Sequence, residues 1–274
     1  MSELGSGVID PGRPHEDVPD GLVAAETGEE IIDSLRRVRR VEEARLRARH
    51  PGEGLRERKR RLTRHLISDT ATAMFASRGF DAVKVTEIAD RANISMKTLY
   101  NYFPTKEAMV FDDADELIED VAAALRERRD GMPVTDAFVG ALQGNMYRYD
   151  LLDDELAASV AMTFAALVKQ TPALHAHWLE IQDRIGRAAA RELALQAGAE
   201  PADPRAALAG WALGGLIQVD MDSRVRHIRA GKRGAELRHA VAGDVRQAAE
   251  LLETGLASLG RSTRAAARNG GAPG

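Results

Sequence analysis

The sequence of 274 residues contains no cysteine. A disulfide framework, a thiolate metal site and a cysteine nucleophile are therefore all excluded. Long apolar runs are missing too, since nowhere do about eighteen apolar residues, the length that a membrane-spanning helix needs, follow one another without a charge. The acidic N-terminus, with Glu3 and Asp10, lacks the basic-then-apolar order of a signal peptide. We expect a soluble, cytoplasmic protein that makes no membrane contact.

Sequence patterns typical of catalysis are also absent. The chain has no glycine-rich phosphate-binding loop and no nucleophile elbow. His175 and His177 are the only closely spaced histidines, but residues two apart on a helix point in different directions, which disfavours a shared metal ion. Asp153 and Asp154 precede a helical pattern, where carboxylates cap the helix and interact with its dipole. We therefore expect no enzyme, no catalytic residues, no metal and no cofactor.

Strand patterns are likewise lacking. Aromatic residues make up 4% of the chain, and no segment alternates convincingly between apolar and polar residues. Apolar residues recur instead at the spacing of amphipathic helices, interrupted by glycine and proline. The predicted fold class is therefore all-α. We predict short helices between residues 80 and 103 and longer ones at 27–50, 55–78, 105–129, 134–149, 154–170, 173–198, 204–229 and 235–259.

Charge is distributed unevenly along the chain, although the net charge is only −4. Residues 55–110 carry eleven basic and six acidic side chains, whereas the regions before and after them are both acidic. A positive block between two negative ones is typical of a DNA-binding module joined to a different kind of domain.

Residues 85–103 carry the most informative pattern. Asn93 tolerates the left-handed conformation that a chain reversal between two short helices requires. Ser95 can cap the second helix, whose Leu99 and Phe103 face the core. The other side chains of that helix point elsewhere, and a short exposed helix fits the major groove of DNA. The alternative is a helical hairpin that merely carries polar surface residues.

The same region contains residues in the order and spacing of a known DNA-binding domain. They are Phe80-Asp81-Ala82, Val85, Glu87-Ile88-Ala89, Ile94-Ser95 and the run from Thr98 to Glu107. Residues 56–112 therefore resemble the N-terminal domain of the tetracycline-repressor (TetR) family. The rest of the chain is similar to that family only in being helical and of suitable length. The resemblance implies a three-helix helix-turn-helix domain followed by a larger helical domain for ligand binding and dimerisation.

The resemblance also implies a function. TetR-family members are mostly homodimeric repressors that bind double-stranded operator DNA and leave it when a small-molecule effector binds. An activator or a ligand-independent regulator of the same fold is the alternative. We expect a disordered or partly helical basic extension, the helix-turn-helix domain, the ligand-binding and dimerisation domain and a disordered tail at residues 1–54, 55–104, 105–260 and 261–274, respectively.

The DNA contacts of the family carry over to nine residues of this chain. These expected DNA-binding residues are Thr86, Ser95, Met96, Lys97, Thr98, Tyr100, Asn101, Tyr102 and Lys106. Met96 and Lys97 would face base edges, whereas Tyr102 would lie against a backbone phosphate. Thr86 and Lys106 would anchor phosphates near helix starts, where backbone N–H groups converge. Ser95 is expected to act more as a cap than as a reader of bases.

Two positions depart from the family pattern. Lys84 stands where a threonine usually caps the second helix, and a lysine side chain cannot accept a hydrogen bond from the helix N–H groups. Asn93 replaces the usual turn glycine, a milder change because asparagine tolerates the left-handed conformation. Neither departure affects the expected fold.

The C-terminal domain offers candidates for a ligand cavity and a dimer interface. Phe138, Met146, Met162 and Trp178 lie on apolar helical stripes and are the tentative ligand-binding residues; ordinary core packing is the alternative for each. Small residues at 206–216 allow close helix approach, and we expect them to form a dimer interface together with the helix at 235–259.

The N-terminal extension contains a strongly basic stretch. Residues 36–64 hold thirteen arginines and lysines against four glutamates. One hypothesis is that this arm lies along DNA phosphates or reaches a neighbouring minor groove. The alternative is a solvated helix without a partner.

Overall fold

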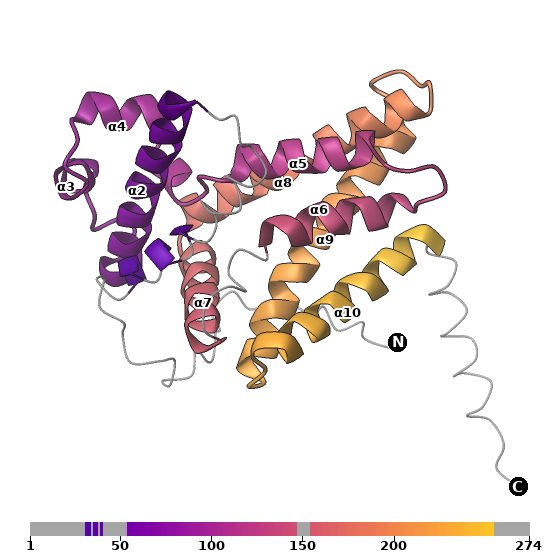
Figure 1. Ribbon diagram of the computed structural model, residues 1–274. Helices are drawn as coiled ribbons and strands as arrows, with labels where there is room; N and C mark the ends of the chain where they lie inside the picture. Colours follow the sequence, from indigo (N-terminus) through magenta and orange to yellow (C-terminus); the bar gives the residue numbers. More distant parts are fainter. Residues whose placement is uncertain (1–30, 34, 38, 41–53, 147–153, 255–274) are drawn as a thin grey trace, which may run out of the picture.

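The computed structural model describes residues 31–33, 35–37, 39–40, 54–146 and 154–254. Within these residues the chain is helical throughout and contains no strand, so the predicted all-α fold is confirmed (Figure 1). None of the described helices combines the length and hydropathy that a membrane crossing would require. The labelled elements are α2 (Leu55–Arg78), α3 (Val85–Arg91), α4 (Met96–Tyr102), η1 (Glu107–Met109), α5 (Ala114–Arg126), α6 (Val134–Met146), α7 (Asp154–Gln170), α8 (Pro172–Gln196), α9 (Pro204–Arg229) and α10 (Gly234–Thr254).

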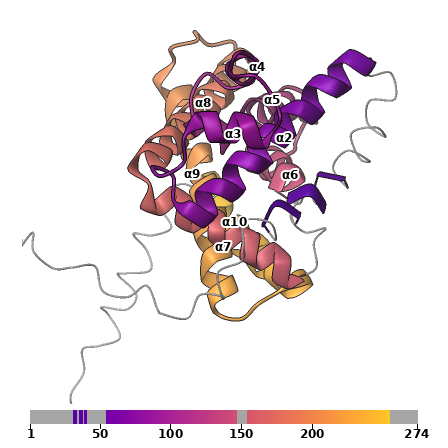
Figure 2. The same cartoon turned by 90° about the vertical axis from the view of Figure 1, so that its left-hand side faces the viewer.

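Helices α2, α3 and α4 form a small unit at one end of the molecule. Helix α2 ends at Gly79, which has a φ of 83° and whose N–H bonds to the Phe75 carbonyl, as the sequence predicts. Phe75, Ile88, Leu99 and Phe103 are completely buried and form the centre of the unit. Helices α3 and α4 lie on its outer side and come forward in the end-on view (Figure 2). The short helices are therefore held rigidly on the larger α2.

The predicted helix at 105–129 is wrong over residues 105–113. The structure has a single 3₁₀ turn, η1, and then a non-helical turn before α5 begins at Ala114. The turn buries Val110 and Phe111 in the main core, and Phe111 stacks on Trp178 of α8 with ring centroids 5.8 Å apart. A continuous helix would not point these residues inward, so tertiary packing overrides the local helical preference.

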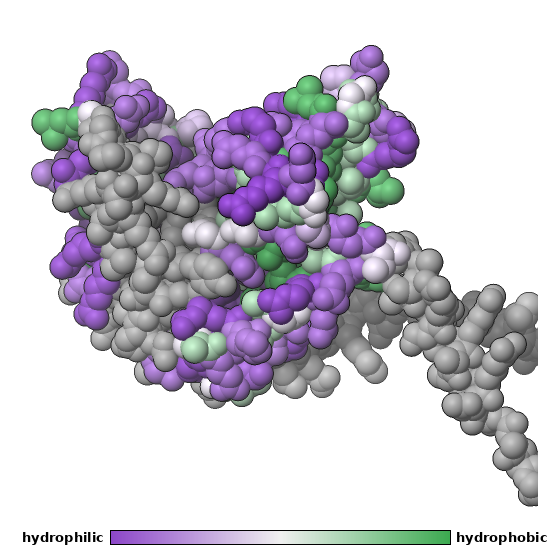
Figure 3. Space-filling model, turned by 45° about the vertical axis from the view of Figure 1, so that its right-hand side comes forward, coloured by the Kyte–Doolittle hydropathy of each residue, from purple (hydrophilic) through white to green (hydrophobic). Residues whose placement is uncertain are grey.

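The larger unit is built around the antiparallel pair α8 and α9, with α5 and α7 against α8 and α10 against α9 (Figure 1). Proline occupies the first turn of both α8 and α9, where its missing N–H costs no hydrogen bond. The glycines at 210 and 214, expected at a dimer interface, are buried against α8 of the same chain instead. Apolar side chains are exposed where α8 ends and α9 begins, including Leu195 and Leu208 (Figure 3).

The described part of the N-terminal extension is a helical segment. We call residues 31–33, 35–37 and 39–40 the N-terminal segment; they lie between the lower half of α2 and α7 (Figure 1). Ile31, Ile32 and Leu35 are buried in a cluster with Ala73 of α2 and Val160 of α7. The N-terminal segment is therefore helical and packed on both structural units. The predicted tail at 261–274 lies outside the described residues.

Candidate functional site

Helix α3 begins without a side-chain cap from Lys84, but it is capped from within. Glu87 reaches back and accepts a hydrogen bond from the Lys84 backbone N–H at 2.8 Å. The same carboxylate pairs with Arg78 of α2, also at 2.8 Å. The backbone hydrogen bond, reinforced by Arg78, holds the pKa of Glu87 below its ordinary value. The unfavourable Lys84 is thus compensated by the acidic half of a capping box, a pattern that the sequence does show.

The reversal between α3 and α4 is as predicted. Asn93 has a φ of 54° and is the only non-glycine residue with positive φ in the part of the chain that the structure describes. Ser95 then caps α4, since its hydroxyl accepts a hydrogen bond from the Thr98 N–H at 3.1 Å. Leu99 and Phe103 are completely buried. These two anchors fix which face of α4 points outward.

The outward face of α4 presents most of the expected DNA-binding residues. Lys97, Tyr100 and Asn101 are exposed on it, with Tyr100 at 51%. Met96, Thr98 and Tyr102 are half-buried beside them. Thr86 at the start of α3 and Ser95 are also exposed. The structure therefore brings eight of the nine expected residues to α4 and the neighbouring start of α3.

Lys106 is the exception, because it follows α4 and its side chain contacts other groups of the protein. Its ammonium donates a hydrogen bond to the Phe80 carbonyl. It also lies 4.2 Å and 5.2 Å from the ring centroids of Phe80 and Phe75, a cation–π arrangement. Desolvation lowers the pKa of Lys106. The half-buried side chain therefore contacts the end of α2 and the turn that follows it.

Arg64 of α2 connects the unit of α2, α3 and α4 to the larger unit, a role that its position in the basic arm did not indicate. Its guanidinium donates to the Tyr102 carbonyl at 2.8 Å and to the Asp112 carbonyl at 3.2 Å. It also lies 4.3 Å from the centroid of the Phe103 ring. One side chain thereby ties the end of α4 to the turn before α5. Exposed cations of the arm remain on the first two turns of α2, namely Arg56, Lys59 and Arg60.

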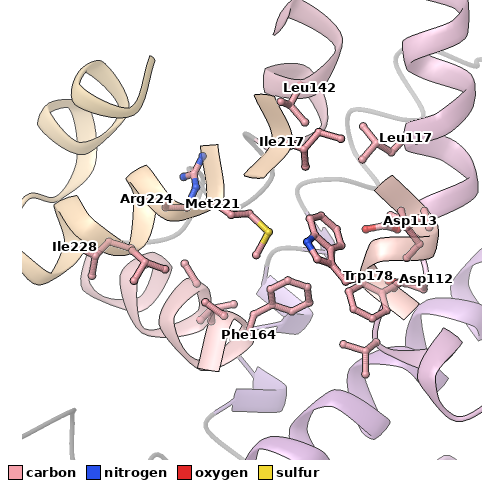
Figure 4. Close-up of a pocket in the computed structure, with 18 of the residues that line it drawn as sticks. Asp112, Asp113, Leu117, Leu142, Phe164, Trp178, Ile217, Met221, Arg224 and Ile228 are labelled. Atoms are coloured by element: carbon pink, nitrogen blue, oxygen red, sulfur yellow. The ribbon is translucent and has the colours of Figure 1, made fainter. Parts of the chain in front are cut away.

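A second candidate site is a partly open cavity of about 160 Å³ in the larger unit (Figure 4). It lies among α5, α7, α8 and α9, and Trp178, Phe164 and Met221 point into it. Most of its lining is apolar, contributed by residues such as Leu117 and Ile217. A cavity of this size and polarity accommodates a single aromatic ring.

Of the four tentative ligand-binding residues, one lines this cavity. Trp178 forms part of the wall. Phe138 and Met162 are buried but are not among the lining residues; Phe138 belongs to the main core and Met162 packs with α9 and α10. The side chain of Met146 lies outside the described residues. Helical periodicity correctly predicts that Phe138, Met162 and Trp178 are buried, but it does not predict which buried side chains line a cavity.

The charged residues of the wall are paired within the protein. Arg224 lies at one end of the cavity and is 3.5 Å from Asp220 on the same helix. Asp112 and Asp113 lie at the other end (Figure 4). Arg39 of the N-terminal segment pairs with both, at 2.7 Å and 3.4 Å. The wall therefore presents no described charge that lacks an opposite partner.

Asp112 has an unusual ionisation. Burial raises the pKa of its carboxyl from 3.8 to about 7, and the nearby Asp113 and Asp69 act in the same direction, against the opposing effect of Arg39. His65 is also near, with a ring nitrogen within 4.8 Å of the carboxylate oxygens of Asp112 and Asp113. Desolvation thus outweighs the ion pair at this position.

This raised pKa predicts a falling stability between about pH 4 and pH 7. In that range folded Asp112 keeps a proton that the unfolded chain has released, so the free energy of unfolding decreases as pH rises and levels off above the folded pKa. Urea unfolding at about pH 5 and about pH 8 measures the difference. Asp112→Asn should flatten this dependence, whereas Asp115→Asn on the exposed face of α5 should leave it unchanged. An equal pH dependence in all three proteins would contradict the assignment.

Comparisons with known proteins agree with the geometry of α2 to α4. Residues 67–112 match the family model described as bacterial regulatory proteins, tetR family. The HTH-type transcriptional regulator TcmR of Streptomyces glaucescens is 29% identical over 152 residues, which span 54% of this chain and 66% of TcmR. The putative mycofactocin biosynthesis transcriptional regulator MftR of Mycobacterium tuberculosis is 26% identical over 61% of this chain and 81% of MftR.

A shorter similarity is confined to one part of the chain. The HTH-type transcriptional repressor KstR of Mycobacterium tuberculosis is 41% identical over 54 residues, or 20% of this chain and 22% of KstR. The match to TcmR covers just under two thirds of that protein's length. All three relatives are named as regulators or repressors of transcription.

Proposed function

We propose that the chain, whose residues 67–112 match the tetR family of bacterial regulatory proteins, binds an inverted-repeat operator in the cytoplasm as a twofold dimer and represses transcription. The observation that carries the proposal is the exposed face of α4. Lys97, Tyr100 and Asn101 are exposed on it, while Leu99 and Phe103 hold the opposite face in the core. A short helix presented in this way enters the major groove, with its N-terminal residues at the base edges.

Lys97 is the side chain best placed to distinguish base sequences. It is exposed on the first turn of α4, where a lysine can bond to the major-groove acceptors of guanine. Lys97→Ala should weaken binding to a selected operator by about 1–3 kcal/mol and relax the preference for one base pair. Tyr102→Phe should instead weaken binding to all sequences alike, because a phosphate contact carries no sequence information.

Operator fragments selected from genomic DNA and titrated by fluorescence anisotropy provide the measurement. Lys169→Ala is the matched control, since Lys169 is exposed at the end of α7, away from the helix-turn-helix. If Lys97→Ala and Tyr102→Phe both bind like the control, the recognition helix is misassigned.

We further propose that an uncharged, aromatic or otherwise apolar small molecule in the cavity releases the protein from its operator. The support is the composition of the wall: aromatic and aliphatic side chains surround a space of about 160 Å³, and the charged residues at its ends already have protein partners. A charged ligand would lose its hydration without finding a free opposite charge. A regulator that needs no ligand is the alternative.

Toluene, benzoate and benzylamine test whether the cavity binds an uncharged ligand in preference to a charged one, because they share one ring and differ in charge. Toluene should bind most tightly of the three. Trp178 provides the signal in a Trp211→Phe background, because the sequence has only two tryptophans. Toluene should weaken operator binding by about 5- to 150-fold, and operator should weaken toluene binding by the same factor.

A cavity-filling variant provides the control for the ligand experiment. Ala161→Phe should abolish toluene binding by occupying the space, whereas Ala173→Phe, exposed on the first turn of α8, should not. Equal operator affinity with and without each compound would support the ligand-independent alternative.

A further inference from the structure

The N-terminal segment is docked on both units of the protein by apolar contacts. Ile31, Ile32 and Leu35 are 7–8% exposed. They pack on Ala73 of α2 and on Val160 of α7, with Ala76 of α2 beside them. The segment thus bridges the helix that carries the DNA-binding unit and a helix that lines the cavity.

Arg39 adds an ionic contact at the same junction. Its guanidinium is bonded to Asp69 of α2 at 3.1 Å, and to Asp112 and Asp113, which precede α5, at 2.7 Å and 3.4 Å. The Arg39 side chain is only 16% exposed. The planar guanidinium can hold several carboxylates at fixed positions, which a single ammonium cannot do. Arg39 therefore fixes the distance between α2 and the turn before α5.

That turn is also a wall of the cavity. Asp112 and Asp113 line the cavity, as does Val160, against which the N-terminal segment packs. Phe111, the preceding residue, stacks on Trp178. A molecule that moves this wall must therefore also move Arg39 or break its ion pairs. In either case the change reaches Asp69, and with it the helix on which α3 and α4 are mounted.

We infer that the N-terminal segment is a clasp and that Arg39 is a positioning residue, which couples the cavity to the DNA-binding unit through Asp69 and Asp112. The coupling to a bound effector rests on the proposed function, whereas the mechanical link itself does not. This role also excludes Arg39 from the DNA-contacting arm, because contact with a phosphate would require it to leave three carboxylates.

The link is tested in the full chain by Arg39→Met, which keeps the apolar stem and removes the charge. Arg36→Met is the matched control, because Arg36 is on the same segment but is 52% exposed and pairs with Asp33 at the surface. Hydrogen exchange of residues 31–40 and 110–117 should become at least about tenfold faster in Arg39→Met, since local opening is no longer opposed by the ion pairs. Exchange equal to that of the control in both stretches would overturn the clasp.

The coupling is tested with the selected operator in the Trp211→Phe background. Operator binding should change the emission of Trp178 in this background and in its Arg36→Met variant, and the change should be lost in its Arg39→Met variant. Should Arg39→Met not fold, Arg39→Lys keeps the charge and should still lose at least about half of the change. Two results would overturn the coupling: Trp178 emission that does not change on operator binding in the parent, or a change that is still present in the Arg39→Met variant. Failure to select any operator would refute the proposed function instead, and hydrogen exchange would still decide the mechanical link.

Discussion

Gly210→Ala is expected to lower the free energy of unfolding by about 3 kcal/mol or more, or to prevent folding. A β-carbon at this position would lie 2.2 Å from the Gly186 carbonyl oxygen and 2.9 Å from the Ala190 backbone nitrogen. Both are backbone atoms of α8, so no side-chain rotation relieves the overlap. Helices α8 and α9, the two longest that the structure describes, must separate to admit a single methyl group, and the wall that they contribute to the cavity moves with them.

Gly215→Ala is the matched control on the same helix. Nothing lies within 4 Å of a β-carbon at that position, and the residue is exposed. Alanine should therefore stabilise α9 by up to about 1 kcal/mol, the ordinary helix preference over glycine. Urea unfolding at one protein concentration measures both changes as shifts of the midpoint. If both variants unfold at the midpoint of the unmodified protein, α8 and α9 do not cross as closely as described.

The features predicted correctly from the sequence are those that depend on neighbours along the chain. The left-handed Asn93, the Ser95 cap and the end of α2 at Gly79 each follow from the conformational preferences of one residue and a few neighbours. The start of α8 at Pro172, one residue before the predicted start at 173, follows from the same local rules. Local preferences therefore set the turn before α4 and the start of that helix, and the burial of Leu99 and Phe103 then decides which face points outward.

Local preferences do not predict the partners of three cationic side chains. Arg39, Arg64 and Lys106 have the same side-chain chemistry as the exposed cations of α2, and in the sequence they belong to the same basic stretch or motif. In the folded chain their partners are an acidic cluster, backbone carbonyls and aromatic rings. An arginine can satisfy its charge at a carboxylate as well as at a phosphate. Which partner it finds depends on contacts between residues up to 74 positions apart.

The cavity shows a related limit. Phe138 and Trp178 both lie on apolar stripes, and both are buried. Only Trp178 borders the space, because the turn at residues 110–113 interrupts the predicted helix and brings Phe111 and Asp112 to α8. The position of that turn is decided by tertiary packing, so neither the cavity nor its acidic end was predictable from helical periodicity.

Leu208→Glu is expected to dissociate the proposed homodimer. Leu208 and Trp211 lie on one face of α9, 66% and 60% exposed in the single chain. Adjacent large apolar side chains that are exposed to solvent in a single chain are typical of a surface that another molecule covers. A second copy is the occupant that fits best, since a twofold axis would bring each α9 face against its own counterpart and bury both leucines.

A glutamate at this position would place two like charges near that axis without compensating partners. The dissociation constant of the dimer should rise at least about 100-fold, which corresponds to about 3 kcal/mol. Operator affinity should fall as well, because a single subunit reaches only one half-site. Met132→Glu, in the exposed connection between α5 and α6, introduces the same charge and should leave both properties unchanged. Sedimentation equilibrium measures the association directly, and a Leu208→Glu protein that remains dimeric at the concentrations of the parent would assign the α9 face to a different partner.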